Sequence, residues 1–138
     1  MGTNIRPEVS QKNQYYLDRH RYYELKHFCL QYPEWRKAYN DIDGYFGGGV
    51  IQISTGKNHK KSRTEIIAEA RLHFLNRIRM VEYAAKEASP ELATYLLVAV
   101  TEGYSYEHLK ARLEIPCGKD LYYDIYRRFF WILDKSRK

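Results

Sequence analysis

The sequence predicts an all-α protein: a helical bundle that ends in a helix-turn-helix, with a glycine-rich basic loop after its N-terminal helices. Three observations support this fold class. Apolar residues recur every three or four positions along most of the chain, serines in helix-capping positions precede several of these runs, and glycines interrupt the pattern between residues 44 and 63. A chain of 138 residues can bury one core, so we expect a single domain-sized unit.

The N-terminal segment, residues 1–43, is predicted to contain a loose polar leader over residues 1–12 and two aromatic helices. Pro33 should end the first helix, at about 14–31, because proline disfavours helical backbone in the preceding residue. A second helix should then run from Pro33 to about Asp43. The apolar stripe of the first helix consists of Tyr22, Leu25, Phe28, Cys29 and Tyr32.

Residues 44–63 are predicted to form a flexible linker, because five glycines and a run of basic residues replace the helical period. The basic residues Lys57, Lys60, Lys61 and Arg63 have no acidic residue among them. With a net charge of +6 and a pI of about 9.2, the chain favours an acidic partner, and nucleic acid is the commonest one. These four residues are therefore candidate DNA contacts.

The C-terminal region, residues 64–138, reads as a succession of helices. Ser62 and Glu65 have the spacing of a capping box, which marks the start of a long helix. Ser89 and Pro90 repeat a start signal, and Gly103 should end the buried helix that follows. The long helix should bury a stripe that recurs over about six turns: Ile67, Ala70, Phe74, Ile78, Val81, Ala85 and Ala88.

The last two helices have the spacing of a helix-turn-helix at residues 105–134. Ser105 caps the first helix, residues 116–119 form the turn, and the second helix runs from about Asp120 to Asp134. Apolar residues should hold the motif together: Leu109, Leu113 and Ile115 from the first helix, and Tyr122, Ile125, Phe129 and Ile132 from the second.

The remaining side chains of the second helix are candidate DNA contacts: Lys119, Tyr123, Tyr126, Arg127 and Arg128. Arginine can bond a guanine edge or a phosphate, and tyrosine can bond phosphate or pack on a thymine methyl. Asp120 and Asp124 would repel phosphate, which argues against DNA binding by electrostatic attraction alone. Residue spacing alone fits a DNA-binding motif and an ordinary helical hairpin that closes the bundle equally well.

No catalytic, metal or cofactor site is predicted. Cys117 has no second cysteine or histidine at zinc-ligand spacing, and Gly118 is too isolated for a phosphate-binding loop. Glu65 and Glu69 lie four apart on a solvated helix face, and His108 lies within an amphipathic helix. The sequence therefore predicts a protein that is not an enzyme.

Residues 101–115, together with the pairs Tyr122–Tyr123 and Arg127–Arg128, resemble the C-terminal part of phage and prophage late-transcription regulators of the RinA and ArpU type. The resemblance covers about the last 40 residues. It implies a helix-turn-helix similar to region 4 of sigma factors, double-stranded DNA as partner and assistance to RNA polymerase. The stretch from Ile115 to the tyrosine pair is one or two residues longer here than in that family.

Two alternatives stay open. A small terminase subunit also marks phage DNA through a helix-turn-helix and assembles into a ring. A non-DNA interaction protein would instead use its aromatic N-terminal helices as a homodimer or partner surface. No apolar run approaches the length of a membrane span, and residues 1–10 lack the apolar core of a signal peptide, so we expect a cytoplasmic protein with no membrane partner.

Overall fold

The computed structural model describes residues 13–47 and 62–137, and all of its regular secondary structure in these ranges is helical. In chain order the elements are α1 (Arg19–Leu30), α2 (Tyr32–Gly47), α3 (Arg63–Ala88), α4 (Ala93–Glu102), α5 (Tyr106–His108), the π-helical turn η1 (Leu109–Leu113) and α6 (Lys119–Ser136). The predicted all-α class is therefore confirmed. Residues 1–12, the predicted leader, lie outside the described ranges.

The first helix ends and the second begins next to Pro33: α1 stops at Leu30 and α2 starts at Tyr32. Asp18 caps α1, since its carboxylate accepts a hydrogen bond from the backbone amide of His20 at 3.1 Å. α2 begins at Tyr32 with Pro33 in its first turn, where proline removes no helical hydrogen bond. The helix continues to Gly47, four residues beyond the predicted end, because it packs along α3.

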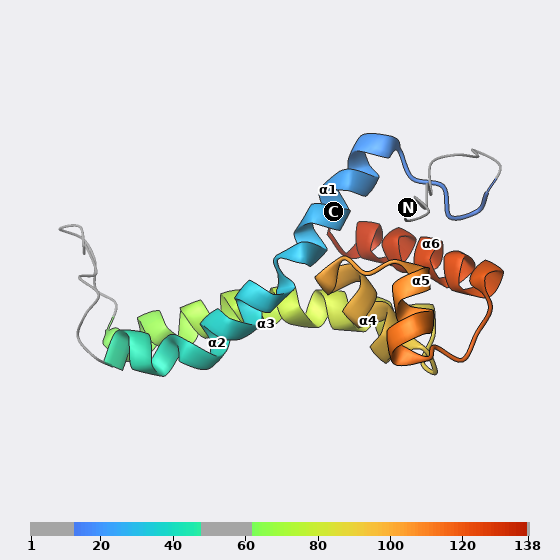
Figure 1. The fold of residues 1–138 in the computed structure, drawn as a ribbon. Coiled ribbons are helices and arrows are strands. Elements are labelled where there is room, and N and C mark those ends of the chain that lie inside the picture. The colour runs from blue at the N-terminus through green and yellow to red at the C-terminus, as the bar shows by residue number, and fades with distance from the viewer. Residues whose placement is uncertain (1–12, 48–61, 138) are drawn as a thin grey trace.

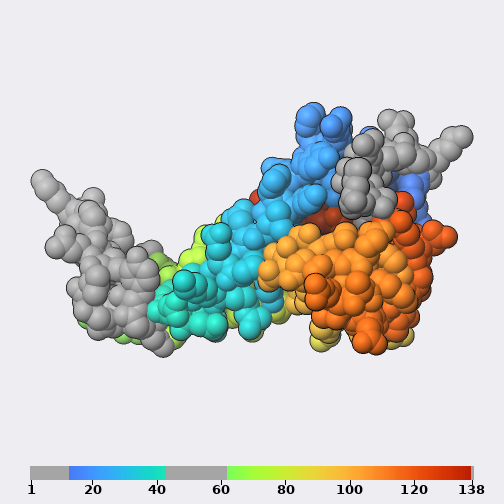
Figure 2. Space-filling view, viewed as in Figure 1, coloured from blue at the N-terminus to red at the C-terminus, as the bar shows by residue number. Residues whose placement is uncertain are grey.

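The long helix α3 is the scaffold of the molecule. Its predicted capping box is present: the Ser62 hydroxyl accepts from the Glu65 amide at 3.2 Å, and the Glu65 carboxylate accepts from the Ser62 amide at 3.1 Å. α2 runs antiparallel to the first half of α3, and the two form an arm that projects from the rest of the protein (Figure 1). Figure 2 shows this arm narrowing away from the rounded body that α1 and α4–α6 form.

The helix α4 begins later than predicted. Residues 90–92 form a turn, and the Ser89 hydroxyl accepts from the Leu92 amide at 3.3 Å, so Ser89 stabilises this turn and not a helix that starts at Pro90. The predicted end is confirmed: Gly103 has φ +77°, the left-handed conformation that glycine adopts without steric cost.

One apolar core joins residues from both ends of the described chain. Leu25 and Cys29 of α1, Val81 of α3, and Phe129 and Leu133 of α6 have no measurable solvent exposure. α6 packs on both α1 and α3. The N-terminal and C-terminal helices therefore complete each other's burial.

Gly103 provides a test of this geometry. Replacing it by alanine should lower the free energy of unfolding by about 1 kcal/mol, because an L side chain at φ +77° is strained. Space is not the cause, since the nearest atom to the new Cβ is Leu30 Cδ2 at an ordinary 3.7 Å. Urea unfolding followed by circular dichroism measures the change.

The matched control is Gly118→Ala. Gly118 has φ −79°, and a Cβ atom added there would meet nothing within 4 Å, so the free energy should change by less than about 0.5 kcal/mol. Equal losses at both glycines would contradict the strain explanation.

Candidate nucleic-acid interface

The predicted helix-turn-helix corresponds to a hairpin made by α5, η1 and α6, with residues 114–118 between η1 and α6. Ser105 caps its first helix as predicted, accepting from the His108 amide at 3.2 Å. Tyr106 fastens the two arms: its hydroxyl donates to the Cys117 carbonyl oxygen at 2.7 Å, and its ring lies 5.5 Å from that of Tyr122. A tyrosine thus fixes the turn from inside the hairpin.

The first arm of the hairpin is not a regular α-helix. After one α-helical turn it widens into η1 and ends at Glu114, which has φ +53°. Leu109 and Ile115 are buried as predicted, but Leu113 is 40% exposed, so the prediction for Leu113 is wrong. A π-helical turn adds a residue to each hydrogen-bonded ring, so the four-residue spacing from Leu109 no longer returns to the same face.

Lys119 begins α6 but does not extend freely into solvent. Its ammonium lies 3.1 Å from a Glu107 carboxylate oxygen and 5.7 Å from the centre of the Tyr123 ring. The Glu107 carboxylate raises the pKa of Lys119, whereas hydrogen bonds from the Glu107 backbone amide and from Lys119 lower the pKa of Glu107. The sequence did not indicate this pair, because a separation of twelve residues across a turn has no periodic signal.

The two candidate tyrosines of α6 lie in different surroundings. Tyr123 is half-buried against Tyr106, with ring centres 6.4 Å apart. Tyr126 was expected to face outward, and this is wrong: it is only 8% exposed, and its hydroxyl oxygen lies 2.7 Å from that of Tyr22 in α1. Its inward direction follows from the packing of α1 on α6, which the periodicity of α6 alone does not reveal.

Arg127 and Arg128 lie on the outer side of α6, where Arg127 is half-buried and Arg128 is exposed. No carboxylate in the described ranges lies within ion-pair distance of either guanidinium. Asp120 and Asp124 are exposed on the preceding turns of the same helix. This surface therefore presents two adjacent cations with acidic neighbours.

Only one of the four candidate basic residues of the predicted loop lies in the described ranges. Lys57, Lys60 and Lys61 lie outside the described ranges, and Arg63 is exposed at the start of α3. α6 packs near the other end of α3 (Figure 1). The 26 residues of α3 span about 39 Å. Arg63 and the arginines of α6 therefore belong to two separate basic regions, near opposite ends of α3.

The net charge is distributed unevenly. The described residues include 17 of the 23 lysines and arginines and 16 of the 17 acidic residues, which leaves a net charge of +1. Most of the formal charge of +6 therefore belongs to residues outside the described ranges. Long-range attraction of an anionic partner does not follow from the helical body alone.

The described residues offer little for covalent or metal chemistry. Burial raises the pKa of the Cys29 thiol and, against the opposing effect of Lys110, that of Cys117, so neither thiol is activated. Within residues 13–47 and 62–137, no group of three or more His, Cys, Asp or Glu side chains could hold a metal ion. None of the described helices is both long and apolar enough to cross a lipid bilayer.

Comparison of the chain with family models, curated proteins and solved structures gives no significant match.

The hydrogen bond of Tyr106 leads to a stability prediction. Tyr106→Phe should lower the free energy of unfolding by about 1 kcal/mol, because the Cys117 carbonyl loses its donor in a partly buried turn. Thermal unfolding of both proteins measures the difference. Tyr104→Phe is the control, since Tyr104 is 36% exposed and its hydroxyl has no hydrogen-bond partner among the described residues. A loss at Tyr104 as large as that at Tyr106 would refute the assigned role.

Proposed function

We propose that the protein binds double-stranded DNA through the α5–η1–α6 hairpin, as a transcription regulator. The observation that supports this most is the pair Arg127 and Arg128 on the outer side of α6, neither of which has a carboxylate partner in the described ranges. Unpaired guanidinium groups on a helix surface suit phosphate oxygens and guanine edges, both of which accept two hydrogen bonds from arginine.

The hairpin is also rigid, as a DNA recognition helix needs to be. Tyr106 holds the turn, and the inner side of α6 is anchored in the core through Tyr122, Phe129 and Leu133. A helix held in this way can present its outer side without rearrangement, which reduces the entropy lost on binding. The five-residue connection makes the hairpin wider than the three- or four-residue turn of ordinary helix-turn-helix motifs.

Acidic residues restrict the mode of binding. Asp120 and Asp124 would weaken indiscriminate contact with phosphates, because each repels the backbone of the duplex. A carboxylate can accept a hydrogen bond from the cytosine amine in the major groove. The surface thus favours selective over general DNA binding, and the family resemblance extends this proposal to RNA polymerase as a second partner.

Titration of a fluorescent mixed-sequence duplex tests the proposal. Arg127→Ala with Arg128→Ala should weaken binding roughly 10- to 100-fold and reduce the slope of log affinity against log salt by about 2, since two phosphate-neutralising cations are removed. Fluorescence anisotropy between about 50 and 200 mM salt gives both quantities.

The control variant is Lys37→Ala with Arg79→Ala, which removes the same charge from exposed positions on α2 and α3. It should retain the affinity of the unmodified protein. Absence of binding at the lowest salt, or equal weakening by both double variants, would rule out the hairpin as a DNA-binding element.

The second candidate is an interaction protein that self-associates. Its expected surface, the aromatic side of the N-terminal helices, is largely used in the protein's own core, since Tyr22 and Trp35 are buried. Two exposed apolar residues on α3 offer another surface. Leu72 and Tyr83 are each 56% exposed and lie eleven residues apart, about three helical turns, so they share one side of the helix. Exposed apolar side chains on one face are typical of contact surfaces.

Sedimentation equilibrium tests this second candidate. If α3 mediates self-association, the protein sediments as a dimer, and Leu72→Glu with Tyr83→Glu converts it to a monomer because the buried charges oppose contact. A monomeric parent protein excludes the candidate. A larger ring, measured by light scattering together with duplex binding, would instead indicate a terminase-type subunit.

A further inference from the structure

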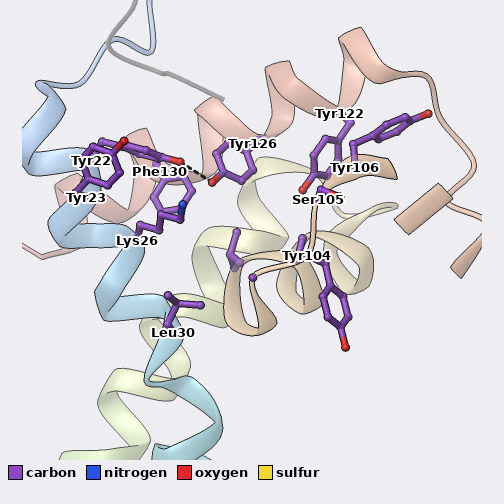
Figure 3. Close-up of a pocket in the computed structure, with 13 residues that line it drawn as sticks. Tyr22, Tyr23, Lys26, Leu30, Tyr104, Ser105, Tyr106, Tyr122, Tyr126 and Phe130 are labelled. Atoms are coloured by element: carbon purple, nitrogen blue, oxygen red, sulfur yellow. Dashed lines mark hydrogen bonds between the residues drawn. The ribbon is translucent and has the colours of Figure 1, made fainter. Parts of the chain in front are cut away.

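The two sides of α6 have different surroundings. Tyr122, Tyr126 and Phe130 line a pocket of about 210 Å³ between α6, α1 and the connection from α4 to α5 (Figure 3). Trp131 follows Tyr122 by nine residues, which is two and a half helical turns, so it lies on the opposite, outer side. Trp131 is nevertheless half-buried. Its cover therefore comes from residues outside the core.

Two neighbours hold the Trp131 ring. Lys135, one turn later in α6, places its ammonium over the ring, 3.9 Å from the ring centre. Tyr15, in the segment before α1, places its ring centre 5.5 Å away, tilted by 60°. That segment is itself anchored, because Leu17 is buried in the core and the Asn13 side chain accepts from the Tyr15 amide at 2.8 Å. Trp131 therefore has a fixed position on the outer side of α6.

Charge is divided along this outer side. Its first half carries the two exposed aspartates, whereas residues 127–136 include a single carboxylate, that of Asp134. Arg21 of α1 donates to this carboxylate at 2.6 Å and so compensates its charge. The other charged residues of the second half are Arg127, Arg128 and Lys135, and none of them forms an ion pair with a carboxylate of the described ranges. We call these three cations together with Trp131 the basic surface of α6.

The division of charge distinguishes between anionic partners. A flat anionic membrane would meet the whole outer side, which spans about 22 Å from Asp120 to Lys135, and it would be repelled by both aspartates. A nucleic-acid backbone is a line of phosphates, and it meets only the part of the helix that it crosses. Crossing over the basic surface therefore gives attraction to three cations and keeps the phosphates away from Asp120 and Asp124.

The covering of Trp131 favours a duplex over a single strand. Proteins that bind single strands stack unpaired bases on open aromatic faces. The Lys135 ammonium lies over a face of the Trp131 ring, and Tyr15 packs beside that ring. Trp131 can still contact the sugars of a backbone through the part of its surface that is open. An ammonium held over the ring is also preorganised to meet a phosphate.

We propose that the backbone of one strand of duplex DNA crosses α6 over the basic surface. Its phosphates are held by Arg127, Arg128 and Lys135, its sugars pack on Trp131, and Tyr15 is a positioning residue that fixes Trp131. The inference rests on the proposed function and adds the place of the crossing and its sequence-independent character. The first turns of α6 are then left for base edges, which recognition helices read with their N-terminal residues.

Tryptophan fluorescence reports the crossing directly. The chain has two tryptophans, and Trp35 is only 6% exposed, so acrylamide quenches mainly Trp131. At about 50 mM salt a saturating mixed-sequence duplex should roughly halve the quenching constant, because contact excludes solvent from the ring. Trp131→Phe should lack this protection. Single-stranded DNA of equal length and poly-L-glutamate should protect Trp131 less than the duplex, and equal protection by either would overturn the choice of a duplex.

Lys135→Met tests the same crossing by affinity. Binding should weaken about three- to tenfold, and the slope of log affinity against log salt should fall by about 1. Both changes should be the same for two duplexes of different sequence, because phosphate contacts carry no sequence information. Lys86→Met, on the exposed last turn of α3, is the matched control and should change neither quantity. Equal effects of the two substitutions, or an effect of Lys135→Met on one sequence only, would contradict the crossing.

Tyr15→Ala tests the positioning role. It should increase acrylamide quenching of Trp131 in the free protein and weaken duplex binding about threefold, without a change in the salt slope, because the lost contact is aromatic and uncharged. Tyr15→Phe keeps the ring and should restore both properties. Circular dichroism confirms that each variant is folded. A folded Tyr15→Ala with unchanged quenching and affinity would remove Tyr15 from the site.

The outcomes separate this inference from the proposed function. If a duplex binds with a salt slope that depends on Arg127 and Arg128, but neither protects Trp131 nor responds to Lys135→Met, DNA binding stands and the crossing over the basic surface is wrong. If no duplex binds at the lowest salt, both are wrong.

Discussion

The contact between α1 and α6 is the constraint on which the rest of the structure depends. Arg21 donates to the Asp134 carboxylate at 2.6 Å, and the hydroxyls of Tyr22 and Tyr126 meet at 2.7 Å. These polar contacts fix how the two helices are rotated against each other, while the apolar residues between them close the core. The same contact decides which side of α6 faces outward and which lines the pocket.

Local signals in the sequence were sufficient to predict most of the helices and several of their ends. The capping box at Ser62, the helix boundary beside Pro33 and the left-handed helix end at Gly103 each depend on a few neighbouring residues, so they can be predicted without knowledge of distant partners. The start of α1, the end of α2 and the start of α4 were misplaced by three to five residues. At α2, packing against α3 outweighs the low helix propensity of glycine; before α4, a separate hydrogen-bonded turn intervenes.

The candidate site could be predicted only in part. Arg127 and Arg128 are outward, as the apolar stripe of α6 indicated. Tyr126 is inward because Tyr22, more than a hundred residues away, provides its hydroxyl partner, and periodicity holds no information about such a pairing. Leu113 left the core because η1 changes the helical repeat locally.

The pairing of α1 with α6 also affects how the protein folds during synthesis. Residues such as Leu25 and Cys29 are covered by a helix that emerges from the ribosome about a hundred residues later. Until then α1 must keep an aromatic and aliphatic surface in water or on transient partners, whereas the α2–α3 hairpin can form much earlier. The core can therefore be completed only after α6 has been synthesised. A chain truncated before α6 would be incompletely folded and prone to aggregation.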